Sequence, residues 1–190
     1  MSVSTSPSNG KTPSSARSAT SALPDIPGLG GAIAGIVGGL AMIVVAAMLS
    51  ISLGHDIWQE PRQIATIFYG PAALAPGAGF APVIAGTIVH FAISAALGAI
   101  FGIVSRRMLR LPSDYGVPVV AGLIYGLLVW MVAFFAFLPV FIPALLDTYA
   151  PSFIIQNLVY GAVTGLVYSQ LRPQPYNDVE LDSALAPAIK

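Results

Sequence analysis

Four long stretches without Asp, Glu, Lys, Arg or His constrain this chain most: residues 26–54, 63–89, 115–146 and 148–171. Charged residues make up 8% of the chain and hydrophobic residues 56%, with a mean hydropathy of +0.81. In soluble domains about a quarter of residues are charged. A helix needs about 20 apolar residues to cross roughly 30 Å of hydrocarbon, and each stretch is long enough. The sequence therefore predicts a protein that lies in a lipid bilayer.

We expect an all-α fold, a bundle of four transmembrane helices within a membrane domain at residues 28–172. Residues 1–27 are rich in Ser and Pro, and residues 173–190 are acidic, so both are predicted to be disordered tails. The first apolar run is too long for a cleaved signal peptide, which predicts a retained anchor. The expected spans are residues 29–53, 82–105, 117–138 and 152–171.

Prolines mark the ends of further elements. Pro61 suits the first turn of a helix that should end at Tyr69, before Gly70. Such a helix is too short to span a membrane, so we place it in the first outer loop, at the interface or as a shallow re-entrant piece; a fifth span is the alternative. Pro139 and Pro143 should break or kink the chain after the third span.

The distribution of Lys and Arg predicts the orientation. Seven of the eight fall on one side of the predicted topology, and only Arg62 falls on the other. The excess of positive charge marks the cytoplasmic side, so both termini should be cytoplasmic. A net charge of zero argues against nucleic-acid binding, and the lack of cysteine excludes disulfides and thiolate sites. The seven are Lys11, Arg17, Arg106, Arg107, Arg110, Arg172 and Lys190.

The spans also resemble one another. Residues 34–40 align with 121–127 without gaps, and His90 in the second span falls opposite Asn157 in the fourth. The chain is therefore either two related helical hairpins in parallel orientation or a chance match between small-residue helices. Glycines four residues apart lie on nearly one helix face, where helices pack closely in lipid. The expected packing glycines are Gly35, Gly39, Gly98, Gly102, Gly122, Gly126, Gly161 and Gly165.

His90 is the one ionisable residue well inside a predicted span, and it makes a candidate intramembrane polar site with Ser94, Gln156 and Asn157. Polar groups at such depth face the bundle interior and are candidates for function. The alternative is a neutral imidazole that only holds helices together by a hydrogen bond. A third possibility is axial ligation of a tetrapyrrole by His90, since small residues flank it; no other cofactor is expected.

A second candidate site is a polar cluster in the outer loops. Carboxylates and a histidine there could handle protons or bind a cation. The alternative is an ordinary hydrated loop with a surface ion pair between Glu60 and Arg62. No motif of a metalloprotease, serine hydrolase, P-loop or dinucleotide enzyme occurs, so we expect neither an enzyme nor a metal site. The cluster comprises His55, Asp56, Glu60, Arg62 and Asp147.

Several features of the layout occur together over about residues 28–172: GAIAGIVGG at residues 31–39, Trp58, Pro61-Arg62, His90-Phe91, a proline-broken outer loop and a last helix that ends at an arginine. With these features the chain resembles the YagU-like family of uncharacterised bacterial inner-membrane proteins. The resemblance implies a four-helix fold in the inner membrane and no activity, and Asn157 departs from a histidine frequent in that family.

Three functional hypotheses follow. The first is a non-enzymatic structural or assembly subunit that packs on other membrane proteins, or on itself, through its glycine faces. The second is a small transporter or proton-linked channel that uses His90 and the outer charged loop. The third is a tetrapyrrole-binding subunit with His90 as axial ligand.

Overall fold

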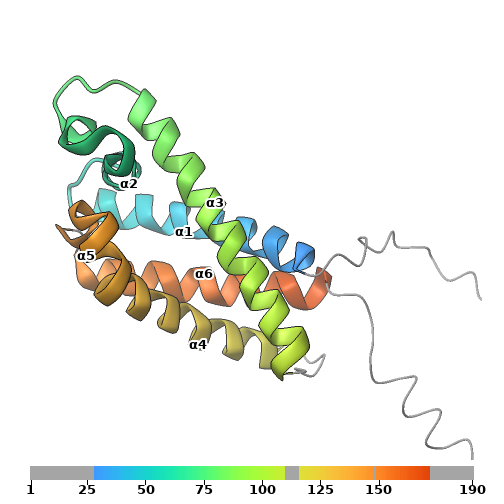
Figure 1. Ribbon diagram of the computed structural model, residues 1–190. Helices are drawn as coiled ribbons and strands as arrows, with labels where there is room; N and C mark the ends of the chain where they lie inside the picture. The colour runs from blue at the N-terminus through green and yellow to red at the C-terminus, as the bar shows by residue number, and fades with distance from the viewer. Residues whose placement is uncertain (1–27, 110–115, 148, 172–190) are drawn as a thin grey trace, which may run out of the picture.

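The computed structural model describes residues 28–109, 116–147 and 149–171. In these residues the chain is all-α: four long apolar helices that could cross a membrane pack as a bundle, with a short extra helix (Figure 1). This confirms the predicted fold class. The predictions for the two tails, and for Arg110 and Arg172, concern parts of the chain outside the described residues.

The long helices begin within two residues of their predicted starts, and all but the third also end within one residue of their predicted ends. They are α1 (Leu29–Ser52), α3 (Ala81–Val104), α4 (Gly116–Val132) and α6 (Ala150–Leu171). A π-helical turn, Ser105–Leu109, follows α3. A second π-helical turn, Ala133–Phe137, joins α4 to the short α5 (Leu138–Phe141), so the third apolar stretch runs from Gly116 to Phe141.

The third span continues through Pro139, where a break or kink was expected. A regular α-helix would press the ring of Pro139 against the carbonyl of Phe135. The wider π-helical turn covers Phe135 and relieves this clash locally. Helical structure then ends at Ile142, with φ −141° and ψ 61°, directly before Pro143. Pro143 begins a 3₁₀ turn, Pro143–Asp147.

The predicted short helix is α2 (Gln59–Tyr69), with Pro61 in its first turn. It ends at Gly70, whose φ of +57° favours glycine, and a 3₁₀ turn, Gly70–Leu74, follows. Its 11 residues are too few to cross a membrane, so the described chain has four candidate spans rather than five. A Cβ at Gly86 would overlap the carbonyl of Pro61, and glycine there lets the backbone of α2 lie on α3.

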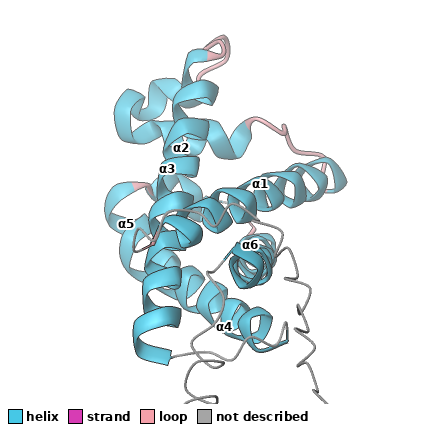
Figure 2. Cartoon of the chain, turned by 90° about the vertical axis from the view of Figure 1, so that its right-hand side faces the viewer, coloured by secondary structure: helices cyan, strands magenta, loops and turns pink. Residues whose placement is uncertain are grey.

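Helix α6 is central, because α4 and α1 both pack along it, and α3 packs on α1 (Figure 1). Figure 2 shows α6 nearly end-on, among the other three long helices. The described chain begins and ends at one end of the bundle, which also holds the Ser105–Leu109 turn. Helix α2 lies at the other end, called the α2 end below.

Glycines at aligned positions bring the two helices of each hairpin together, α1 with α3 and α4 with α6. A Cβ at Gly35 would overlap the carbonyl of Ser94 and lie 2.8 Å from the Cα of Gly98. A Cβ at Gly122, which aligns with Gly35, would overlap a carbonyl of α6 and lie 3.2 Å from the next glycine Cα. This recurrence supports the interpretation of two related hairpins. The α6 residues in question are Gly161 and Gly165, the aligned counterparts of Ser94 and Gly98.

Candidate functional site

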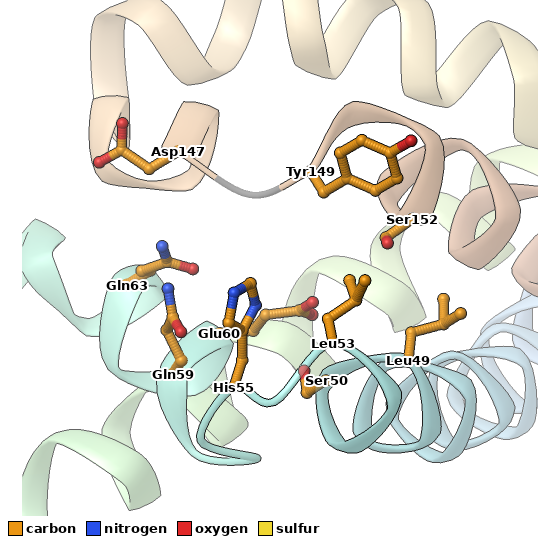
Figure 3. A pocket seen from close by; sticks show the side chains of 10 residues that line it. All are labelled: Leu49, Ser50, Leu53, His55, Gln59, Glu60, Gln63, Asp147, Tyr149 and Ser152. Carbon is orange, nitrogen blue, oxygen red and sulfur yellow. The ribbon is translucent and has the colours of Figure 1, made fainter.

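A polar hollow opens at the α2 end. The end of α1, the loop after it and α2 form one side, and Asp147, Tyr149 and Ser152 face them from the other (Figure 3). It is a small hollow, with about 20 Å³ of space for water-sized molecules, and it is partly open to solvent. Three residues of the predicted outer cluster line it together: His55, Glu60 and Asp147. The remaining lining residues are Leu49, Ser50, Leu53, Gln59 and Gln63.

One residue that lines the hollow, Glu60, is hydrogen-bonded to a helix far away in the sequence. Nε2 of Gln156 in α6 donates a hydrogen bond of 2.8 Å to Oε1 of Glu60 in α2. Gln156 is fully buried, with 0% of its surface exposed. Burial raises the pKa of the Glu60 carboxyl above its ordinary value of 4.5, and the hydrogen bond from Gln156 opposes that rise. The pocket therefore favours the protonated form of Glu60.

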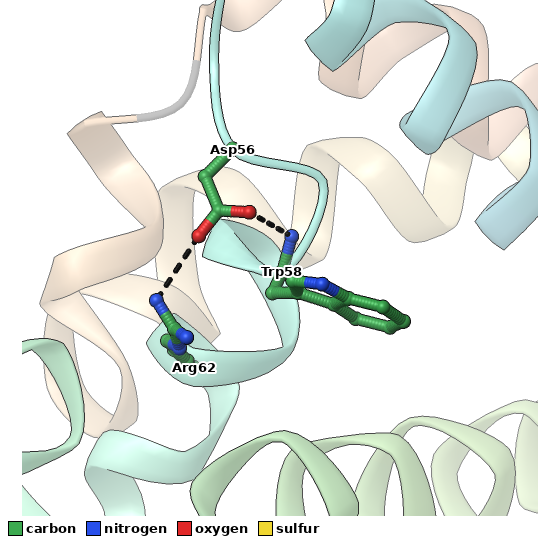
Figure 4. A network of polar contacts seen from close by, with 3 residues as sticks. All are labelled: Asp56, Trp58 and Arg62. Carbon is green, nitrogen blue, oxygen red and sulfur yellow. Dashed lines mark hydrogen bonds and ion pairs between the residues drawn. The ribbon is translucent and has the colours of Figure 1, made fainter. Parts of the chain in front are cut away.

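Asp56 and Arg62 pair beside the pocket without lining it. Arg62 Nη1 lies 3.0 Å from Asp56 Oδ2, and Asp56 Oδ1 accepts a 3.1 Å bond from the backbone N–H of Trp58 (Figure 4). The second bond is an Asx turn that leads the chain into α2. The expected pairing of Arg62 with Glu60 is therefore wrong: the partner of Arg62 is Asp56, and Glu60 bonds to Gln156.

The candidate intramembrane residues take separate partners. His90 Nε2 in α3 lies 3.0 Å from the backbone carbonyl of Gly39 in α1, instead of bonding to one of the polar side chains proposed for it. Asn157 donates to the carbonyl of Phe153, one turn earlier in its own helix. Gln156 bonds to Glu60, which lines the hollow at the α2 end. The backbone carbonyl of Ser94 accepts a hydrogen bond from the hydroxyl of Tyr160, 2.8 Å away.

Three intramembrane tyrosines are a feature that the sequence analysis missed. Each hydroxyl donates to a backbone carbonyl of α3, at 2.8 Å, 2.8 Å and 3.0 Å, and so ties α4 or α6 to α3. Their position in the sequence was a signal that could have revealed these bonds. Tyrosines of membrane proteins concentrate at the interfaces, whereas these lie within the spans. A buried tyrosine hydroxyl needs a hydrogen-bond partner, so a partner on another helix could have been expected. The pairs are Tyr125 with Leu97, Tyr160 with Ser94, and Tyr168 with Gly102.

The described residues contain no group of three or more His, Cys, Asp or Glu side chains that could hold a metal ion. A tetrapyrrole bound at His90 Nε2 would have to replace its bond to the Gly39 carbonyl. It would also have to enter between α1 and α3, where a Cβ at Gly39 would lie only 3.3 Å from that nitrogen. Among the side chains that line the hollow at the α2 end, His55, Glu60 and Asp147 can exchange protons.

Comparison with known proteins gives one match. The model of a family of unknown function (DUF6789) matches residues 27–179. No curated protein and no solved structure matches the chain. The sequence resemblance pointed to an uncharacterised family over about residues 28–172. The match confirms that the chain falls in an uncharacterised family over this range, but that family is DUF6789 and not the YagU-like family.

Proposed function

The chain belongs to DUF6789, a family of unknown function, and we propose that it is a small, non-enzymatic, proton-linked membrane transport protein. The hydrogen bond between Glu60 and Gln156 is the observation that carries this proposal. Ionisable groups held away from water in membrane proteins commonly mark proton or ion pathways. Here such a group sits in a polar pocket and contacts the central helix of the bundle.

The pocket faces the outside in this proposal. Arg106 and Arg107 lie in the turn after α3, at the end of the bundle opposite α2, whereas Arg62 lies at the α2 end. Lys and Arg are enriched on the cytoplasmic side, so the α2 end faces outward and both termini face the cytoplasm. The resemblance to YagU-like proteins supports the bacterial inner membrane as the location, and we propose that the two families are related.

Glu60, rather than His90, is the proton-binding group of this proposal. The Glu60 carboxyl lines an open hollow, and its bond to Gln156 ties the separate helix α2 to α6. When the Glu60 carboxyl gains or loses a proton, the charge at its hydrogen bond to Gln156 changes. This change can shift α2 relative to the bundle. His90 Nε2 is bonded to the Gly39 carbonyl, a contact that holds α1 and α3 together.

Proton flux into liposomes tests the proposal. Purified protein is reconstituted with an internal pH-sensitive dye, and flux is followed after an imposed pH gradient. We expect Glu60→Gln to abolish protein-dependent flux and Tyr69→Phe, a change at an exposed residue of the same helix, to preserve it. Equal flux with wild-type protein, Glu60→Gln and empty liposomes would contradict the proposal.

A second candidate is the structural or assembly subunit, and the packing of α4 favours it. Among the long helices α4 packs closely only along α6, and much of its surface is apolar and exposed, as at Val120, Ile124 and Val132. In this proposal the glycine faces form the packing surfaces inside each hairpin, and α4 meets another membrane subunit. Co-purification in mild detergent tests it, and recovery of the monomer alone under several mild conditions counts against it.

The tetrapyrrole hypothesis has a direct test as well. A visible absorbance band in protein purified from native membranes, lost in His90→Ala, would support it. A colourless preparation would reject it.

A further inference from the structure

The side-chain oxygen of Gln156, Oε1, has no hydrogen-bond partner among the described residues. A carboxamide has two N–H donors and one oxygen acceptor. Nε2 of Gln156 donates to Glu60, whereas Oε1 is buried and meets no donor among the described residues. A buried acceptor without a donor costs about 1–3 kcal/mol. The arrangement therefore calls for a donor beside Glu60.

A protonated carboxyl is a donor of the right shape. Its carbonyl oxygen accepts from an amide N–H while its O–H donates to the amide oxygen, and the two bonds close a ring. The first bond is already present, 2.8 Å between Gln156 Nε2 and Glu60 Oε1. An ionised Glu60 can only accept, so it cannot satisfy Gln156 Oε1.

We infer that Glu60 and Gln156 together form a proton-binding site, in which a proton on Glu60 Oε2 is donated to Gln156 Oε1 and closes a neutral acid–amide pair. The inference rests on the proposed function, because it specifies the protonation state of the same pocket. Loss of the proton breaks one of the two bonds and leaves a charge beside a buried acceptor. Helix α2 is then held less firmly on α6 at high pH than at low pH.

The other charged groups near Glu60 come from loops. His55 and Asp147 line the same hollow, from the loop after α1 and from the Pro143–Asp147 turn. Arg62, on α2 itself, is paired with Asp56. The described residues of α1, α3 and α6 contribute one ionisable group besides tyrosines, His90, which is bonded to Gly39.

Infrared difference spectroscopy on the full chain in lipid nanodiscs tests the inference, because a protonated carboxyl has a carbonyl stretch that carboxylates lack. Spectra are recorded as the pH is raised from acidic to alkaline. We expect the carbonyl band of protonated Glu60 to persist above pH 4.5, the ordinary pKa of glutamate, and to shift in heavy water. The band should be absent in Glu60→Gln and retained in Asp56→Asn, which alters an exposed carboxylate that does not line the hollow.

Gln156→Met supplies a second variant that keeps Glu60 and removes the amide. We expect its band to remain but to move in frequency, because the ring of two hydrogen bonds is lost. Titration of the Glu60 band at the ordinary value overturns the inference. So does a band that disappears at fixed pH when sodium, potassium or methylammonium is added, because a cation would then be the occupant.

The infrared and flux experiments can fail separately. A persistent Glu60 band without proton flux in liposomes supports the proton-binding site and removes the transport proposal. Flux that depends on Glu60 without a persistent band supports transport and overturns the acid–amide pair. Melting curves of each variant show that a lost band reflects chemistry rather than unfolding.

Discussion

Replacement of Gly31 by alanine, compared with the same change at Gly30, measures the contact between α1 and α3. The two residues are neighbours in one helix, and alanine raises helix propensity equally at both, by up to about 1 kcal/mol. Their surroundings differ. A Cβ at Gly31 would overlap the carbonyl of Gly98 and lie 3.0 Å from the Cα of Gly102, whereas a Cβ at Gly30 would have no neighbour closer than 3.9 Å.

The cost at Gly31 follows from the atoms involved. Both neighbours are backbone atoms, which cannot rotate away as a side chain can, so α1 must move away from α3. Overpacking of this kind costs about 1–3 kcal/mol, and inside lipid the lost contact is van der Waals packing that nothing else replaces. We therefore expect Gly31→Ala to be less stable than Gly30→Ala by about that amount.

Thermal unfolding in detergent, followed by circular dichroism or by tryptophan fluorescence, measures the difference. Gly30→Ala should match or exceed the wild type, and Gly31→Ala should melt several degrees lower. The reasoning is refuted if the two variants melt together, because helix propensity alone would then explain both. Gly122→Ala extends the test to the second hairpin, where a Cβ would overlap the carbonyl of Gly161.

Three further changes test other contacts. Tyr160→Phe removes the hydroxyl that donates to the Ser94 carbonyl, and we expect a loss of about 1 kcal/mol in stability, whereas Tyr149→Phe at an exposed position should cost nothing measurable. Asp56→Asn weakens an ion pair whose side chains are 48% and 29% exposed, so the expected loss is below about 1 kcal/mol and should shrink in high salt. Because burial raises the pKa of Glu60 in the folded state, the stability that this group contributes is fully present below pH 4.5 and is lost as the pH rises through the raised pKa. Melting temperatures of wild type and Glu60→Gln should therefore diverge as the pH increases, with the wild type becoming the less stable, and parallel curves would contradict the raised pKa.

The number and bounds of the spans could be predicted because charge and proline are strong local signals. A charged side chain in lipid is costly, so the gaps between charges mark the spans. Helix α2 was predicted from Pro61 at its start and Gly70 at its end. The end of the third span was placed too early, because a π-helical turn before Pro139 depends on how the helix relaxes around the ring.

The candidate site could be predicted only in pieces. Glu60 was assigned to the outer cluster and Gln156 to the intramembrane site, and the structure joins them across 96 positions of the sequence. Gln156 is six residues from the start of α6, or about 9 Å along the helix, which already places it near the α2 end. The tyrosine bonds escaped prediction because their acceptors are backbone carbonyls, which every residue carries.

One aligned pair of residues shows how the two hairpins differ. Gly38 in α1 aligns with Tyr125 in α4. A Cβ at Gly38 would lie 2.9 Å from the Tyr160 carbonyl, so glycine lets α1 lie directly on α6. Tyr125 instead fills the equivalent space between α4 and α3: its ring lies 5.2 Å from that of Phe101, and its hydroxyl donates to the Leu97 carbonyl.

Tyr125 is therefore a spacer as well as a hydrogen-bond donor, and two variants separate these roles. Tyr125→Phe keeps the ring and loses the hydroxyl, so it should cost about 1 kcal/mol in unfolding free energy. Tyr125→Ala also empties the space that the ring fills. Large aromatic side chains replaced by alanine in a packed core lose about 3–5 kcal/mol, and Tyr125 is only partly buried, so we expect a loss larger than that of Tyr125→Phe and below that range. If both variants lose the same stability, the packing of the Tyr125 ring contributes nothing measurable. The separation of α3 from α4 would then have to come from the lipid around them.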